Sequence, residues 1–132
     1  MAYRVIRSDE HEWAERPPRH GQTLPRYTVD LTTAAALRET RARIWRLPPG
    51  TRGPRHRERA QEEVFVVLAG TLTLLLGEPP ERFDLPPQSV ASAEPGTPLQ
   101  LRNESDGDVV VFAYGAPPVV GEAEYLDDVD LS

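Results

Sequence analysis

The residues best suited to chemistry in this sequence are His56, Glu58 and Glu63, which lie in the stretch HRERAQEEVFVVL. Residues two apart on a strand share a face, so His56 and Glu58 can point together into a barrel, and Glu63 at the start of the next strand can converge on them. One imidazole and two carboxylates form a hard, oxygen-rich set of ligands. Such a set would suit one divalent metal ion, manganese(II), iron(II) or magnesium, with zinc or nickel as adventitious occupants, although these residues alone do not require a metal.

The cost of burying these carboxylates also points to a cation. Two carboxylates held close inside a barrel repel each other and resist desolvation, so a raised pKa, an arginine or a metal must compensate. Arg55 and Arg57 have the opposite parity to His56 and Glu58 on a regular strand, which makes them poor internal partners. A bulge would reverse that inference.

The same stretch also fits a solvated loop. In that interpretation Glu58 and Glu62 face water, His56 is exposed, and Glu63 is satisfied by backbone donors. No metal is then bound. The residues of this stretch leave both interpretations open.

The spacing of Gly50, His56, Glu63 and Gly70 resembles the first sequence motif of the cupins. Glu58 occupies the position of that motif's second histidine, and the other four positions match. A second cupin motif is present in part within EPGTPLQLRN, where Gly96 and Asn103 are in place.

The second motif departs from the family pattern where its histidine should be. Leu99 stands at that position, while Gln88 and Glu94 replace a glycine and a proline. The loss of the histidine removes a metal ligand and makes that wall apolar. This substitution favours a degenerate metal site.

The resemblance implies an all-β double-stranded β-helix, a jelly-roll barrel, over residues 37–115. It implies His56, Glu58 and Glu63 as the metal ligands, and a homodimer. A pocket lined by apolar residues and a few polar groups suits a small molecule. We predict that its lining includes Phe65, Leu99, Leu101 and Asn103.

Alternating apolar and polar residues, interrupted by Pro and Gly, agree with an all-β fold. We predict strands at residues 39–47, 63–68, 71–76, 82–85, 89–94, 99–103 and 109–114. The one helix-prone window, residues 32–43, predicts at most a short helix. Residues 1–36 are expected to form an arm on the barrel or on a neighbouring subunit, and residues 116–132 an acidic tail that is mobile unless Tyr125 and Leu126 dock.

Length and composition predict one domain. The chain has 132 residues, no cysteine and 14 prolines, so a disulfide framework is excluded and short elements with many turns are expected. No apolar run approaches the length of a bilayer span, and we expect a cytoplasmic protein without a membrane partner. A formal net charge of −6 argues against nucleic acid as a partner. The arginines Arg52, Arg55, Arg57 and Arg59 are interpreted as a solvated basic loop.

Three functions remain open at this point. The first is a small-molecule-binding cupin with a degenerate metal site, in a binding or sensing role. The second is a metal-dependent cupin enzyme of the oxygenase or isomerase type that uses His56, Glu58 and Glu63. The third is a self-associating structural module.

Trp13 and Trp45 are interpreted as core or subunit-contact residues.

Overall fold

The computed structural model describes residues 2–18, 22–119 and 121–130. Its strands are β1 (Ala14–Arg16), β2 (Arg26–Asp30), β3 (Arg41–Leu47), β4 (His56–Glu58), β5 (Glu62–Ala69), β6 (Leu72–Leu76), β7 (Glu81–Leu85), β8 (Val90–Ala93), β9 (Leu99–Arg102), β10 (Val109–Ala116) and β11 (Ala123–Tyr125). A 3₁₀-helix, η1 (Ser8–Glu10), and a single-turn α-helix, α1 (Leu31–Ala34), complete the fold. Asp30 caps α1 by accepting a hydrogen bond from the Thr33 amide.

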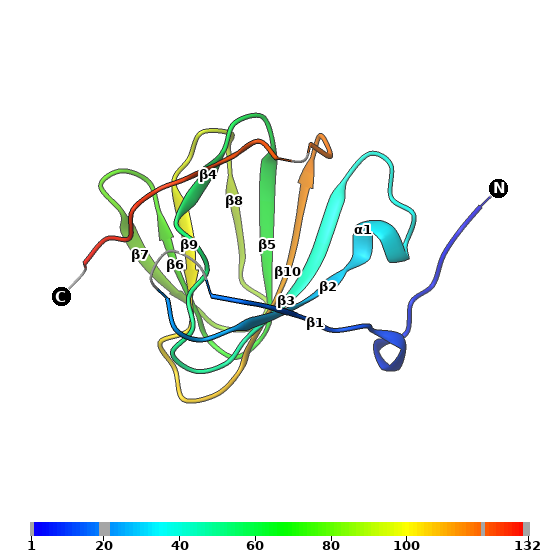
Figure 1. Ribbon diagram of the computed structural model, residues 1–132, viewed down its shortest axis with the longest axis horizontal. Coiled ribbons are helices and arrows are strands. Elements are labelled where there is room, and N and C mark those ends of the chain that lie inside the picture. The colour runs from blue at the N-terminus through cyan, green and yellow to red at the C-terminus, as the bar shows by residue number, and fades with distance from the viewer. Residues whose placement is uncertain (1, 19–21, 120, 131–132) are drawn as a thin grey trace.

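The strands form two antiparallel sheets that face each other (Figure 1). The six-stranded sheet has the order β1-β2-β3-β10-β5-β8, and the five-stranded sheet has the order β11-β4-β9-β6-β7. The predicted all-β jelly-roll barrel is confirmed. The seven strands expected from the alternation are present as β3 and β5 to β10.

The core lies between the two sheets and follows from the alternation along each strand. On β5, the inward residues Phe65 and Val67 are buried, whereas Leu68 is exposed. On the facing sheet, Leu72 and Leu74 of β6 are fully buried. This packing fixes the register of β5, and Glu63, two residues before Phe65, therefore also points inward.

The turn from β5 to β6 requires a glycine. Gly70 has a φ of +75°, and a Cβ atom there would clash with the carbonyl oxygen of Asp108. Only a residue without a side chain fits this conformation and this close approach. The last glycine of the first motif therefore closes the hairpin that begins with the strand of Glu63.

The two terminal segments extend the sheets. Strand β2 pairs with β3, and β1 pairs with β2, so part of the segment expected as an arm continues the six-stranded sheet. Strand β11 pairs with β4, and the Leu126 amide donates to the Arg55 carbonyl, so the tail is docked at Tyr125 and Leu126. Residues 1, 19–21, 120, 131 and 132 of these two segments lie outside the described residues.

Within the described ranges, neither helical segment has the length and apolar character needed to cross a membrane.

Candidate functional site

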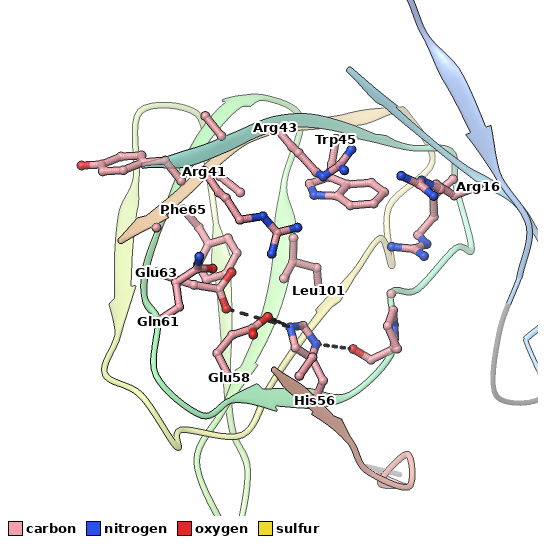
Figure 2. A pocket seen from close by; sticks show the side chains of 18 of the residues that line it. Arg16, Arg41, Arg43, Trp45, His56, Glu58, Gln61, Glu63, Phe65 and Leu101 are labelled. Carbon is pink, nitrogen blue, oxygen red and sulfur yellow. Dashed lines mark hydrogen bonds and ion pairs between the residues drawn. The ribbon is translucent and has the colours of Figure 1, made fainter. Parts of the chain in front are cut away.

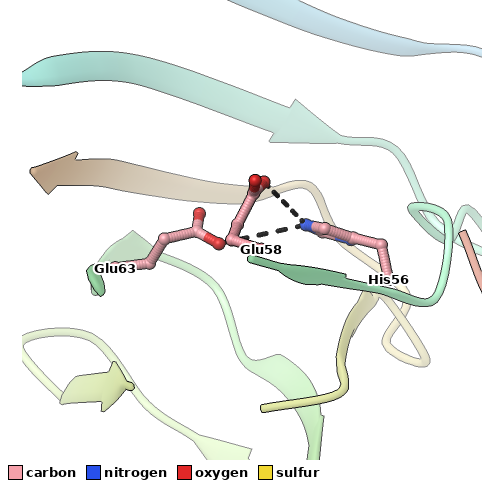
Figure 3. A group of neighbouring side chains, drawn as sticks. All are labelled: His56, Glu58 and Glu63. Atoms are coloured by element: carbon pink, nitrogen blue, oxygen red, sulfur yellow. Dashed lines mark ion pairs between the residues drawn. The ribbon is translucent and has the colours of Figure 1, made fainter. Parts of the chain in front are cut away.

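His56, Glu58 and Glu63 meet at the junction of the two sheets (Figure 3). His56 and Glu58 lie on β4 of the five-stranded sheet, and Glu63 lies on β5 of the six-stranded sheet. The Nε2 atom of His56 is 3.6 Å from Glu58 Oε1 and 3.9 Å from Glu63 Oε1. In the described part of the chain this is the one cluster of three such groups whose ligand atoms lie within 4.8 Å of one another.

The imidazole of His56 is oriented by its other nitrogen. Nδ1 lies 3.0 Å from the carbonyl oxygen of Pro54, and because a carbonyl can only accept, Nδ1 carries the proton. Nε2 is thereby left facing the two carboxylates. A histidine that donates Nδ1–H to a backbone carbonyl presents Nε2 as a typical metal ligand.

Of the two neighbouring carboxylates, Glu63 is the one whose ionised form is destabilised. Burial raises the pKa of Glu63 to about 7, and the charge of Glu58 adds to the rise, while His56 and Arg41 oppose it. Its Oε1 atom is buried and has no hydrogen-bond partner. A buried carboxylate oxygen that accepts no hydrogen bond is costly, so a cation here would stabilise the ionised side chain.

The interaction between Glu58 and His56 shifts the pKa of each group toward its charged form. The interaction with His56 lowers the pKa of Glu58, although burial opposes this shift. Burial tends to lower the pKa of His56, but Glu58, the Pro54 carbonyl and Glu63 together raise it. Both carboxylates therefore favour a positive charge at this point, and the donor set of one nitrogen and two acidic oxygens fits a divalent ion.

Gln61 and Gly115 hold the corner between β4 and β5. The Gln61 side chain is buried, and its amide donates to the Pro117 carbonyl at 3.0 Å. A Cβ atom at Gly115, which pairs with Glu63 in register, would lie 2.7 Å from the Gln61 side chain and from the Glu62 carbonyl. The absence of a side chain at Gly115 therefore lets Gln61 pack where Glu58 and Glu63 converge.

The cluster borders a cavity of about 600 Å³ inside the barrel (Figure 2). Phe65 and Leu101 line it, as do all three candidate metal ligands. Trp45 also lines the cavity. The interpretation of Trp45 as a core or contact residue is therefore incomplete, because its ring both packs on the core and borders the cavity.

Two residues expected in the pocket lining lie elsewhere. Leu99 pairs with His56 across the β4–β9 ladder, but it is 2% exposed and packs in the core behind the cavity wall. Asn103 is also buried, and its amide donates to the carbonyls of Leu47 and Gly107. Asn103 thus holds a turn together, and the prediction that Leu99 and Asn103 line the pocket is corrected.

Arginines of β1, β2 and β3 line the cavity, and the sequence analysis did not predict them. Arg41 and Arg43 share a strand face with Trp45 and border the cavity, together with Arg16 of β1 and Arg26 of β2. Figure 2 shows Arg41 pointing from β3 into the cavity, on the side opposite His56 and Glu58. The signal was present in RARIWRL, where Arg41 and Arg43 have the same parity as the buried Leu47.

The arginine-rich loop, expected to be solvated, binds the acidic tail. Arg57 makes two hydrogen bonds to Glu124, and Arg52 pairs with Asp128 at 3.0 Å. These contacts fasten β11 against β4, where the Tyr125 ring lies 6.3 Å from the His56 ring. The docked tail therefore forms part of the wall around the candidate metal site.

Comparison with known proteins agrees with this arrangement. A family model described as the cupin domain matches residues 43–114, which is more than half of the chain. The chain belongs to the cupin family. A search of curated proteins found no match for this cupin.

Several solved structures share this fold. A sugar phosphate isomerase of the cupin superfamily from Silicibacter pomeroyi has a TM-score of 0.77 at 21% identity, covering 95% of this chain and 83% of its own. A predicted oxalate decarboxylase from Thermotoga maritima has a TM-score of 0.75 at 17% identity, covering 86% of this chain and 98% of its own. An uncharacterised protein with a double-stranded β-helix domain from Klebsiella pneumoniae has a TM-score of 0.70 at 17% identity, covering 95% of this chain and 98% of its own. At these identities the similarity establishes the fold.

Proposed function

We propose that this cupin binds one divalent metal ion through His56, Glu58 and Glu63 and holds a small molecule beside it in the barrel. The observation that carries the proposal is the convergence of three ligand atoms within 4.8 Å at the wall of a cavity of about 600 Å³. Small-molecule sites commonly have volumes in this range. The buried Oε1 of Glu63, which has no hydrogen-bond partner, supports a cation at this point.

Each part of the site has a separate task in this proposal. His56 presents Nε2 because Pro54 accepts its Nδ1 proton, and Glu58 and Glu63 supply the negative charge. A bound divalent ion supplies a Lewis acid that polarises an oxygen of the ligand. Phe65 and Leu101 provide apolar surface that excludes water from the bound molecule.

The ligand set favours a hard ion. With one nitrogen and two carboxylates, manganese(II), iron(II) or magnesium fits better than a soft ion, and zinc or nickel would bind adventitiously. Leu99 occupies the position where the family pattern places a further histidine, so the site is degenerate. We therefore expect weaker metal binding than at a site with three imidazoles.

Isothermal titration of the chelator-treated protein with manganese(II) tests this proposal. We expect one site per chain in the natural protein and loss of that site in His56→Ala. His11→Ala is the control, because His11 lies outside the cluster. Binding that is absent in the natural protein, or unchanged in His56→Ala, would contradict the proposal.

An enzyme of the proton-transfer type is a second candidate. Glu58 and Glu63 both line the cavity, so either carboxylate can accept a proton from a bound molecule. Two of the similar structures are named as an isomerase and a decarboxylase. Incorporation of solvent deuterium into a panel of enolisable acids and sugars, followed by NMR, tests this candidate. We expect exchange that depends on Glu58 or Glu63, and no exchange with any member of the panel would exclude this candidate for those substrate classes.

Self-association remains a prediction that is compatible with both candidates. We propose a homodimer, and light scattering of the full chain measures its mass directly. A monomeric mass across the accessible concentration range would refute it. The third function, a purely structural module, would gain support only if neither metal nor small molecule bound.

A further inference from the structure

The cavity carries opposite charges on its two sides. His56, Glu58 and Glu63 form the acidic side. Four arginines, Arg16, Arg26, Arg41 and Arg43, line the same cavity. They come from β1, β2 and β3, which are neighbours in the six-stranded sheet. The positive side of the cavity is therefore built by adjacent strands rather than by one loop.

The charges of Arg16, Arg41 and Arg43 are poorly compensated by the described part of the protein. Among the residues the structure describes, no carboxylate lies within ion-pair distance of Arg16, Arg41 or Arg43. Arg41 donates from Nη1 to the Val119 carbonyl at 2.8 Å. The Nη1 atom of Arg43 is buried and has no hydrogen-bond partner. A buried guanidinium N–H without an acceptor is costly.

The arginines also repel one another. Burial is the main cause that lowers the pKa of Arg43; the charge of Asp30 opposes this shift, and the charges of Arg16 and Arg41 add to it. Guanidinium groups remain protonated in proteins, so the repulsion persists at neutral pH. A negative group bound between them would relieve it.

The glutamates across the cavity cannot serve as that negative group. Glu58 and Glu63 face His56 Nε2, at 3.6 Å and 3.9 Å. Arg41 lowers the pKa of both glutamates but forms an ion pair with neither. The cavity therefore has an acidic side, formed with His56, and a separate side lined by arginines.

We propose that the small molecule bound in this cavity carries a carboxylate or phosphate group, which Arg41 and Arg43 hold on the β3 side while its other end faces His56, Glu58 and Glu63. This inference rests on the proposed function, because it assumes that the cavity is the ligand site. Arginine presents a planar set of donors that matches both oxyanions. The chain as a whole carries a net charge of −6, so the attraction of an anion depends on these local arginines.

Trp45 provides a built-in reporter for the test. Its ring lines the cavity, and the guanidinium of Arg26 lies 4.7 Å from the ring centre. The chain has two tryptophans, so a Trp13→Phe background leaves Trp45 as the only source of indole fluorescence. The chelator-treated protein is titrated with inorganic phosphate, glucose 6-phosphate, glucuronate and glucose at constant ionic strength.

We expect a saturable fluorescence change with phosphate-bearing or carboxylate-bearing probes and none with glucose. A preference between glucose 6-phosphate and glucuronate distinguishes the two oxyanions. Arg41→Gln and Arg43→Gln should each weaken anion binding by about tenfold or more, because a charge-assisted hydrogen bond is lost. The anion affinity of Arg43→Lys should lie between those of the natural protein and Arg43→Gln, since lysine keeps the charge but not the planar donors. Arg38→Gln is the charge-matched control, because Arg38 is exposed and outside the cavity lining.

The results separate this inference from the metal proposal. Arg43→Gln should retain manganese(II) binding while its anion binding weakens, and His56→Ala should lose manganese(II) binding while it retains the anion. An anion response that is equal in the arginine variants and in the natural sequence, an equal response to glucose, or no saturable response to any anionic probe would overturn the inference. None of these outcomes would alter a measured metal stoichiometry, so the two proposals can fail separately.

Discussion

His56 on β4 and Glu63 on β5 belong to different sheets, yet His56 Nε2 lies 3.9 Å from Glu63 Oε1. The contact joins the two sheets at one end of the cavity. Because neither side chain reaches this position without the correct register of its own strand, the site depends on the whole barrel. The pairing of Glu63 with Gly115, and of His56 with Leu99, fixes those registers.

Glu63 and its neighbour Glu62 form a matched pair for mutation. Glu63 points into the cavity, whereas Glu62 is exposed on the same strand. Glu63→Gln removes a charged ligand and should weaken manganese(II) binding by at least about tenfold, since metal sites depend on deprotonated donors. Glu62→Gln should leave binding unchanged. Equal affinities of the two variants, measured by titration calorimetry, would place the metal elsewhere.

The stability of the metal-free protein should fall as the pH rises toward neutrality. The pKa of Glu63 is about 7 when folded against an ordinary value of 4.5, so between these values the folded protein binds more protons, and deprotonation favours unfolding. The raised pKa of His56 acts in the same direction above its usual 6.5. Urea denaturation at about pH 5 and pH 8 should differ by up to about 3 kcal/mol from Glu63 alone.

Glu63→Gln provides the control for that pH dependence. The amide does not titrate, so the decline between about pH 5 and pH 8 should become shallower. Manganese(II) added to the natural protein should restore stability most at the higher pH, because metal binds the deprotonated ligands. A pH profile identical in the natural protein and in Glu63→Gln would show that the buried carboxylate is not responsible.

Leu99→His tests the position that departs from the family pattern. Leu99 lies opposite His56 on the same sheet face and is buried, so an imidazole there should destabilise the metal-free protein by about 2 kcal/mol or more. Manganese(II) should recover more stability in this variant than in the natural protein, because the new imidazole can join the ligands. Leu74→His is the matched control, since Leu74 is equally buried but does not face His56 in register. Thermal denaturation with and without manganese(II) measures the stability that metal restores in each variant. Equal recovery in Leu99→His and Leu74→His would show that the imidazole at position 99 does not bind the metal.

Gly115→Ala should damage the corner that holds the glutamates. The added Cβ would lie 2.7 Å from the Gln61 side chain and from the Glu62 carbonyl, and overpacking of this kind costs about 1–3 kcal/mol. Gly107→Ala is the control, because a Cβ there meets nothing within 4 Å. Urea denaturation of both variants checks this expectation, and similar stabilities would show that Gln61 moves aside without cost.

The strands and the candidate ligands could be predicted from the sequence. Period-two alternation predicted β5 and β6, and the parity of His56 and Glu58 placed both on one strand face. The spacing of Glu63 from these two residues was informative because the β4–β5 connection is short. The family and the jelly-roll fold are confirmed.

The arginine side of the cavity was harder to predict. Strand β3 has large residues on both faces, with Ile44 on one and Trp45 on the other, so hydrophobicity does not identify the inner face. The structure identifies that face through Trp45 and the buried Leu47, which share it with Arg41 and Arg43. The docking of the tail depends on ion pairs between residues far apart in sequence, such as Arg57 and Glu124, and no local pattern predicts those.

The most direct test of the central claim is an anomalous difference map from crystals of the full chain grown with manganese(II). The account predicts one strong peak bounded by His56 Nε2 and the carboxylates of Glu58 and Glu63, with that peak lost in His56→Ala crystals. A map with no peak at this position at saturating manganese(II), or with its main peak bound by other residues, would contradict it.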